Sequence, residues 1–264
     1  MLSGINSSTE YLIKIDNLSK SFPAEAGLKI NVLQDITFNI PKSEKGIITT
    51  ILAPFGSGKS TLLKIISEII KPDSGEINFN ETNKIIPLIP EKPSSFPWLN
   101  VKENIEFILN QHNENQDVNR IISLVGLSGY ENHYPHNKSI GFRFRISLAR
   151  ALAVNPSLIL IDDSFKMMKA ESRGEIYDLL LNLSLNLKQN FIIATTNLIE
   201  AVRLSDKIIL MSKKPGRIIK EFNLSGEDRL KIADHKSEIF TAIKSEIEAA
   251  FEAVDTLSTI NYSL

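Results

Sequence analysis

The stretch that decides the fold reads ILAPFGSGKSTLLKIISEIIKPDSGEI and covers residues 51–77. It continues the apolar run KGIITTILAP (residues 45–54), whose length and composition predict a buried strand. After the glycines, apolar side chains recur at helical spacing, at Leu62, Ile65, Ile66 and Ile69. The predicted order is therefore strand, glycine-rich loop, helix.

This order of elements is the one that a phosphate-binding loop requires. Gly56 and Gly58 let the backbone turn so that several N–H groups point inward, and the positive end of the helix that begins near Lys59 adds to them. Lys59 is expected to reach the terminal phosphates of a nucleotide, and Ser60 to offer its hydroxyl to magnesium. An accidental glycine- and serine-rich turn is the other explanation, which the flanking strand and helix disfavour.

The loop departs from the pattern G-x-x-x-x-G-K-[ST] at one position. Ala53 stands where the pattern has its first glycine. If the position needs a positive φ, the methyl group costs about 1–2 kcal/mol. If it does not, the substitution has almost no cost, so the backbone at Ala53 decides whether the loop is intact.

A second buried run supplies a candidate metal ligand. The segment SLILIDD (residues 157–163) predicts a strand that ends at Asp162. Because ligands of parallel α/β sheets bind at the carboxyl ends of the strands, we expect Asp162 beside the loop as a partner of magnesium. An aspartate that merely caps a strand-to-loop turn is the alternative.

Composition narrows the function classes. Hydrophobic residues make up 42% of the chain and charged residues 23%, which are ordinary globular values. The 30 basic and 31 acidic residues nearly balance, which disfavours nucleic-acid binding as the main activity. The lack of cysteine excludes disulfides and thiolate metal sites. Neither a secretory signal nor a spanning run of ~20 apolar residues is recognised, so we expect a cytosolic chain or one held at a membrane by a partner.

The segments around the loop predict a layered α/β domain. Residues 11–40 alternate as two strands of an antiparallel flap, whereas residues 98–152 carry helical periodicity in three segments and predict a helical lobe. The apolar runs at 157–162 and 191–196 flank a helix-like segment, which is typical of a parallel βαβ unit.

The end of the chain predicts a hairpin and a helix. Residues 207–222 are expected to form a hairpin that turns at Pro215 and Gly216. Beyond it, an apolar stripe with spacings of four, four, three and four predicts an amphipathic helix that packs on the domain. The stripe consists of Ile239, Ile243, Ile247, Ala250 and Val254.

With these elements in place, the chain resembles the ATP-binding subunits of ABC transporters from about residue 11 to about residue 222, especially those of nitrate, sulfonate, taurine or bicarbonate importers. The resemblance rests on KPDSGEI after the loop and, in order, on PWLNVKENI (97–105), YPHNKSIGFRFRISLARAL (134–152) and IEAVRLSDKIILM (199–211). It implies a P-loop NTPase (RecA-like) core with the β flap and the helical subdomain. The implied ATP-binding domain covers residues 1–222, and a C-terminal helical extension covers 223–264.

The resemblance also implies cofactors, partners and site residues. The cofactors are ATP and Mg²⁺, and the partners are a membrane permease, which the helical lobe touches, and a second ABC ATPase subunit in a homo- or heterodimer, without nucleic acid. The implied location is peripheral, on the cytoplasmic face of the cell membrane. The implied metal ligands are Ser60 and Asp162. The implied ATP-binding residues are Phe22, Ala53, Pro54, Phe55, Gly56, Ser57, Gly58, Lys59, Ser60 and Thr61. Phe22 falls near the aromatic residue that stacks on adenine, although core packing explains a lone phenylalanine equally well.

Several positions depart from the family pattern. Glu91 stands at the Q-loop glutamine, Lys169 at the D-loop aspartate and Ser164 at the proline after the catalytic glutamate. Asp163 replaces that glutamate and is one methylene shorter, which should slow proton abstraction from water. Thr196 replaces the switch histidine and cannot share charge as imidazole does. The signature L-S-G-G-Q is replaced by Lys138, Ser139, Ile140, Gly141 and Phe142.

The residues that survive bind nucleotide, whereas the altered ones hydrolyse it or grip it across a head-to-tail dimer. We therefore interpret the chain as an ATP-binding importer subunit with weak or no hydrolysis, paired with an intact ATPase subunit. A homodimer would combine the altered groups in both sites. The alternative is a fully active ATPase motor, since Asp163 keeps a carboxylate. An ATPase of DNA repair or chromosome structure is set aside, because 264 residues leave no room for its coiled coil.

Overall fold

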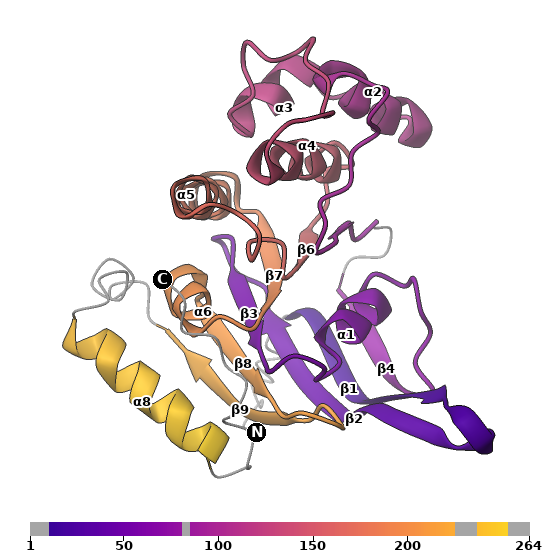
Figure 1. The fold of residues 1–264 in the computed structure, drawn as a ribbon, viewed down its shortest axis with the longest axis vertical. Coiled ribbons are helices and arrows are strands. Elements are labelled where there is room, and N and C mark those ends of the chain that lie inside the picture. The colour runs from indigo at the N-terminus through magenta and orange to yellow at the C-terminus, as the bar shows by residue number, and fades with distance from the viewer. Residues whose placement is uncertain (1–10, 81–84, 225–236, 253–264) are drawn as a thin grey trace, which may run out of the picture.

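The computed structural model describes residues 11–80, 85–224 and 237–252 of the chain. Two sheets form the base of the molecule, a lobe of helices stands above them, and the last helix lies along one side (Figure 1). The predicted α/β class, with an antiparallel flap, a helical subdomain and a C-terminal helix, is confirmed.

The larger sheet carries the edge at which the predicted site residues lie. Its six strands follow the order β5-β6-β7-β3-β8-β9, with every pair parallel except β8 and β9. Every residue of β3, β6 and β8 is buried, which explains their unbroken apolar runs. The strands are β3 (Ile48–Leu52), β5 (Leu88–Ile89), β6 (Leu158–Asp162), β7 (Asn190–Thr195), β8 (Lys207–Met211) and β9 (Ile218–Asn223).

The smaller sheet is the predicted flap. Its strands β1 (Tyr11–Pro23), β2 (Lys29–Pro41) and β4 (Ser74–Phe79) are antiparallel in the order β2-β1-β4, and the short 3-10 helix Glu25–Gly27 joins the first two. The alternating buried side chains of β2 share a core cluster with residues of β3 and α1. The flap is therefore packed against the elements on both sides of the glycine loop.

The helices fall into three groups. Helices α2, α3 and α4 form the lobe, α1, α5 and α6 accompany the larger sheet, and α8 closes the described chain (Figure 1). Their bounds are α1 (Lys59–Ile66), α2 (Val101–His112), α3 (Val118–Leu124), α4 (Ile140–Leu152), α5 (Ala170–Leu187), α6 (Leu198–Leu204) and α8 (Glu238–Glu252). In the described part of the chain, no helix has the length and the hydrophobicity that crossing a bilayer would require.

Helix α8 uses the predicted apolar stripe to dock on the domain. Ile247 is completely buried, and Ile239, Ile243 and Ala250 pack around the same cluster, which also contains side chains of α6, β8 and β9. Lys220 of β9 forms an ion pair with Glu246 at the exposed edge of this contact. Val254, the last residue of the predicted stripe, lies outside the described residues.

A buried carboxylate fixes the end of β7. Glu200 is only 3% exposed, and its carboxylate accepts hydrogen bonds from the Tyr177 hydroxyl at 2.8 Å and the Thr195 hydroxyl at 2.6 Å. The backbone N–H of Asn197 donates in turn to the Thr195 hydroxyl at 3.0 Å. Burial raises the pKa of Glu200. These bonds join β7, α5 and α6, so the turn that contains Thr196 is held from both sides.

Replacing Ile247 with alanine should destabilise the protein by about 2–5 kcal/mol, because it empties a buried site between α8 and α6. The matched control is Glu246→Ala on the same helix, which removes an exposed ion pair worth about 1 kcal/mol or less. Urea denaturation of both variants measures the difference. Equal free energies of unfolding would contradict the docked position of α8.

Replacing Tyr177 with phenylalanine should cost about 1–3 kcal/mol, since the buried carboxylate of Glu200 loses one of its two side-chain donors. The same chemical change at Tyr134, whose side chain is 50% exposed, should leave the free energy of unfolding unchanged. Urea titrations of the two variants test the network. A Tyr177→Phe variant as stable as the Tyr134→Phe variant would show that the hydroxyl contributes nothing.

Candidate functional site

The glycine loop connects β3 to α1 in a conformation that only glycine adopts cheaply. Gly56 has φ +77° and Gly58 has φ +93°. At Gly58 space is limiting as well, because a Cβ atom would lie 2.8 Å from Leu33 Cδ2 and 3.0 Å from the carbonyl oxygen of Val32. The flap strand β2 thus presses directly on the loop, and Gly58 is required for both reasons.

The backbone at Ala53 answers the question that the sequence raises. Ala53 is not among the non-glycine residues with positive φ in the described chain. Its side chain is completely buried in the core cluster of β3 and α1, and its N–H donates to the carbonyl of Thr195 at 3.2 Å. The methyl group therefore carries no left-handed strain and adds apolar contact, so the missing glycine does not damage the loop.

Lys59 lies inside the loop that it follows. Its ammonium group donates to the carbonyl oxygens of Ala53 at 2.8 Å and Pro54 at 3.0 Å, and the residue is 7% exposed. Burial lowers the pKa of Lys59 to about 8, although the carboxylates of Asp163 and Asp162 oppose the shift. Neutral carbonyls are weak partners for a buried cation, so an anion that enters the loop would be a better one.

Ser60 and Asp162 meet although 102 residues separate them. The Ser60 hydroxyl donates to Asp162 Oδ1 at 3.0 Å. Burial raises the pKa of Asp162, and this hydrogen bond opposes the rise. The two oxygens fit magnesium, which prefers oxygen ligands and usually takes one or two from protein while phosphates and water supply the rest. No group of three or more histidine, cysteine, aspartate or glutamate side chains that could hold a metal occurs in the described residues.

Asp163, Thr196 and Glu91 gather around the same pair. The backbone of Asp163 has φ +44°, and its N–H donates to the carbonyl of Ala194 at 2.8 Å. Burial raises the pKa of Asp163, whereas Lys59, Lys166 and the backbone N–H of Thr196 lower it. The charge of Glu91 adds to the rise in pKa of both aspartates. The structure thus brings the predicted base, switch and Q-loop positions together with the loop.

The anchor of Glu91 is a contact that the sequence did not predict. The hydroxyl of Ser164, the residue after Asp163, donates to the carbonyl oxygen of Pro90 at 2.9 Å. Pro90 directly follows β5, which pairs in parallel with β6. A serine in place of the family proline therefore ties the segment that carries Glu91 to the end of β6.

The residues at the signature position lie elsewhere. Ser139 caps α4 and accepts a hydrogen bond from the N–H of Phe142 at 3.2 Å, and Ile140 begins the helix. A Cβ atom on Gly141 would lie 3.4 Å from Ser172 of α5. Helix α4 belongs to the lobe and stands apart from α1 (Figure 1). The structure does not bring these four residues to the loop of their own chain.

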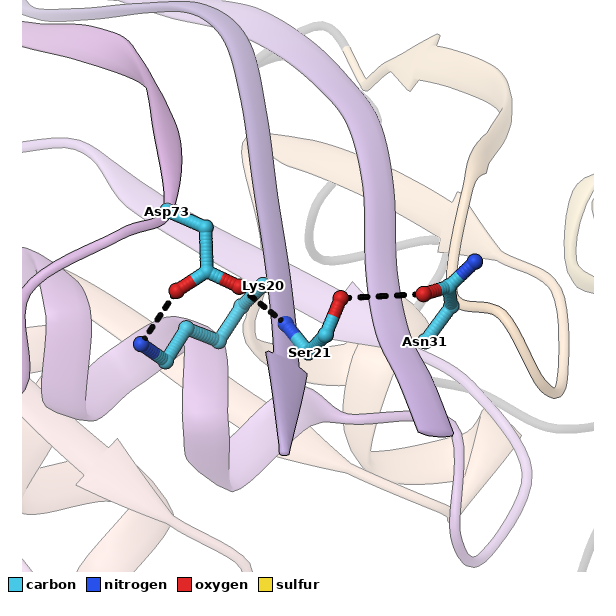
Figure 2. A network of polar contacts seen from close by, with 4 residues as sticks. All are labelled: Lys20, Ser21, Asn31 and Asp73. Atoms are coloured by element: carbon cyan, nitrogen blue, oxygen red, sulfur yellow. Dashed lines mark hydrogen bonds and ion pairs between the residues drawn. The ribbon is translucent and has the colours of Figure 1, made fainter. Parts of the chain in front are cut away.

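Phe22 lies at the end of β1, where a polar network fixes the strand. Asp73, in the turn after α1, accepts hydrogen bonds from Lys20 Nζ and the Ser21 N–H, both at 2.7 Å (Figure 2). The Ser21 hydroxyl donates to Asn31 Oδ1 on β2 at 2.9 Å. Lys20 Nζ lies 5.5 Å from the centre of the half-buried Phe22 ring. The network connects the strand end that carries Phe22 to the turn that leaves the phosphate helix.

The other predicted loop residues differ in exposure. Pro54 and Ser57 are buried, Thr61 is half-buried in the first turn of α1, and Phe55 is 74% exposed. The Ser57 hydroxyl finds no hydrogen-bond partner within the described part of the chain. The phenylalanine at position 55 therefore projects from the loop, whereas its backbone neighbours are enclosed.

Two cations near the site were missed by sequence reasoning. Lys166 is exposed, and its charge affects the pKa of both Lys59 and Asp163. Lys214, in the hairpin between β8 and β9, approaches Gly56. The position of Lys166 four residues after Asp162 was a usable signal, but no local pattern links residue 214 to the loop.

The chain is similar in sequence to several known proteins. The model of the ABC transporter family matches residues 33–166. The aliphatic sulfonates import ATP-binding protein SsuB of Bacillus cereus (strain ZK / E33L) is 34% identical over 248 residues, which cover 91% of this chain and 96% of that protein. The taurine import ATP-binding protein TauB of Pelagibacter ubique (strain HTCC1062) is 32% identical over 218 residues, which cover 79% and 81%.

Solved structures support the fold. The chain matches cbiO1 from Clostridium perfringens, part of the ABC transporter complex cbiONQ, with a TM-score of 0.70, 21% identity and coverage of 93% of this chain and 99% of that one. It matches the dimeric structure of MJ0796, a bacterial ABC transporter cassette, with a TM-score of 0.68, 24% identity and coverage of 81% and 99%. The family match and the identity over nine-tenths of the sequence show that this chain belongs to the ABC transporter family.

Proposed function

We propose that this chain is the ATP-binding subunit of an importer of the sulfonate and taurine class, that it binds MgATP, and that it hydrolyses ATP weakly or not at all. The names of the related SsuB and TauB proteins support the importer class. The observation that carries nucleotide binding is the 3.0 Å hydrogen bond between Ser60 and Asp162 at the mouth of an unstrained loop that encloses Lys59.

The loop provides the binding interactions. Backbone N–H groups of the glycine loop and the first turn of α1 would bind the phosphates, and Lys59 would exchange its two carbonyl partners for phosphate oxygens. Ser60 and Asp162 would hold magnesium, which supplies positive charge to the phosphates when bound. Phe22, held by the network at the end of β1, would stack on the base.

The residues around Asp163 limit hydrolysis. The carboxylate of Asp163 is one methylene shorter than that of glutamate and starts from a backbone that bonds to Ala194, so it cannot advance towards an attacking water. Thr196 lies in a turn fixed through Thr195 and Glu200, and its hydroxyl cannot take up charge. Weak general-base catalysis follows from both features.

The partner subunits follow from the position of α4. The signature residues lie away from the loop of their own chain, so a composite site needs a second ATPase subunit, in a homodimer or, as we favour, in a heterodimer with an intact one. The helical lobe would contact a membrane permease, which places the chain on the cytoplasmic face of the membrane. We assign ATP binding to residues 1–222 and treat residues 223–264 as a separate C-terminal extension, whose helix α8 packs on the domain.

A fully active motor is the second candidate. The observation that favours it is that Asp163, a half-buried carboxylate of raised pKa, lies beside Asp162 and Thr196, where a base would have to be. A raised pKa makes a carboxylate a stronger base once it is ionised. Measured turnover separates the two candidates.

Replacing Lys59 with alanine should weaken MgATP binding by about 100-fold, because the loop loses the charged donor at its centre. Lys64→Ala, an exposed lysine of the same helix, is the matched control and should bind normally. Isothermal titration calorimetry with MgATP measures both. An unchanged dissociation constant for Lys59→Ala would refute the assignment of the site.

Phosphate release from the purified chain with saturating MgATP should equal that of the Lys59→Ala variant or exceed it only slightly. Asp163→Glu should raise it, because the longer side chain restores reach to the water, and adding Thr196→His should raise it further. Phosphate release assays on the four proteins give the comparison. Wild-type turnover well above the Lys59→Ala baseline would favour the active motor instead.

A further inference from the structure

The hairpin between β8 and β9 is bonded to the flap rather than free. The N–H of Gly216 donates to the carbonyl oxygen of Val32 at 2.9 Å, and the N–H of Gln34 donates to the carbonyl oxygen of Gly216 at 2.9 Å. Gly216 thereby bridges to Leu33 in parallel register. Val32 and Leu33 are the two residues that press on Gly58 of the phosphate loop. The hairpin and the loop thus share one strand as a support.

The hairpin also touches the phosphate loop itself. A Cβ atom on Gly216 would lie 2.2 Å from the carbonyl oxygen of Ser57, 2.9 Å from Met211 Cε and 3.3 Å from Leu33 Cδ2. The φ of Gly216 is not in the left-handed region, so the glycine is required for space rather than for conformation. Because the nearest atom belongs to the backbone of the loop, any larger residue would displace the hairpin, the loop or both.

The turn of the hairpin is held rigid by its own side chain. The Ser212 hydroxyl donates to the carbonyl oxygen of Pro215 at 2.9 Å and accepts from the N–H of Arg217 at 3.0 Å. The N–H of Ser212 donates to the carbonyl oxygen of Arg217 at 2.9 Å. Lys214 sits within this closed turn at φ +33°. Its backbone is therefore fixed in a conformation that lysine rarely adopts.

Lys214 extends its side chain over the loop. Its Cε atom lies 3.8 Å from the position that a Cβ atom on Gly56 would occupy, at the exposed part of the phosphate loop. Lys214 makes no hydrogen bond or ion pair with the described residues, and it is exposed. A rigid turn therefore holds the ammonium group of Lys214 near the loop. The close contact between Gly216 and the loop, which only glycine allows, fixes how near the turn lies.

We propose that Lys214 is a second phosphate-contacting lysine, whose ammonium group binds the polyphosphate of the nucleotide from the outer side of the loop. Lys59 contacts the polyphosphate from inside the loop, and Lys214 from the hairpin. A lysine suits this position, since its compact ammonium on a flexible stem can follow phosphate oxygens from a fixed backbone. This inference rests on the proposed function, because it needs the loop to bind a polyphosphate.

The test compares Lys214→Ala with Lys213→Ala, the neighbouring lysine, which is also exposed and has no atom within 4 Å of the Gly56 position. Calorimetry measures the dissociation constants for MgATP and for inorganic triphosphate. Lys214→Ala should weaken both by about 10-fold, the loss expected for one charge-assisted contact, and Lys213→Ala by less than about 2-fold. A loss for MgATP alone would place Lys214 at the nucleoside rather than at the phosphates and overturn the proposal.

Gly216→Ala tests the position of the hairpin independently. It should weaken MgATP binding, because the added methyl group displaces the Ser57 carbonyl or withdraws Lys214. Gly174→Ala on α5 is the control, since nothing lies within 4 Å of its added methyl group. Equal affinities of Lys214→Ala and Lys213→Ala, with Lys59→Ala still defective, would overturn this inference alone. A Lys59→Ala variant that binds MgATP normally would instead overturn the proposed function.

Discussion

The phosphate loop is enclosed by backbone on two sides, and this lack of space is the constraint on which the site depends. Val32 and Leu33 of the flap press on Gly58, and Gly216 of the hairpin meets the carbonyl of Ser57. At both contacts the glycine has only a hydrogen atom where other residues have a side chain. The chain is therefore closely packed there, and the loop has little freedom to open. Rigid loops bind anions well because their N–H groups are oriented before the ligand arrives. The flap strand at residues 32–33 and the hairpin at residue 216 therefore both hold a loop of six residues in place.

The burial of the site also explains the shifted pKa values of its charged groups. Lys59, Asp162 and Asp163 are all largely removed from water, and burial lowers the pKa of the lysine and raises those of the aspartates. The lysine and the aspartates partly compensate one another, whereas Asp163 adds to the rise in the pKa of Asp162. Among the described residues, Lys59 has only carbonyl partners and the Asp162 carboxylate has only one hydroxyl donor. An anion bound to Lys59 and a cation bound to Asp162 would therefore lower the electrostatic free energy of these buried charges. The free structure thus has the electrostatic preference that a metal–polyphosphate ligand would satisfy.

Much of the architecture was predictable from the sequence, because periodicity and the glycine loop are local signals. The buried strands, the flap, the lobe and the C-terminal helix each follow from spacing within one segment. The state of Ala53 was not predictable, since it depends on a backbone angle that tertiary packing sets. The contact between Gly216 and Ser57 joins residues 159 positions apart (216 minus 57), and a Pro-Gly turn predicts only that the chain reverses there. The approach of Lys214 to Gly56 was likewise not predictable, because no local sequence pattern links the two residues.

The residues assigned to the two proposed activities, binding and weak hydrolysis, follow different strands at one edge of the sheet. The binding groups follow β3, where glycine geometry and the flap fix them, and this part retains the family pattern almost completely. The groups at the hydrolytic positions follow β6 and β7, where Asp163 bonds to Ala194 and Thr195 to Glu200. Neither bond uses the side chain of Asp163 or Thr196, so the backbone is held in place whatever side chains stand at these two positions. Substitution at Asp163 and Thr196 can therefore alter chemistry while the shape of the nucleotide site is preserved.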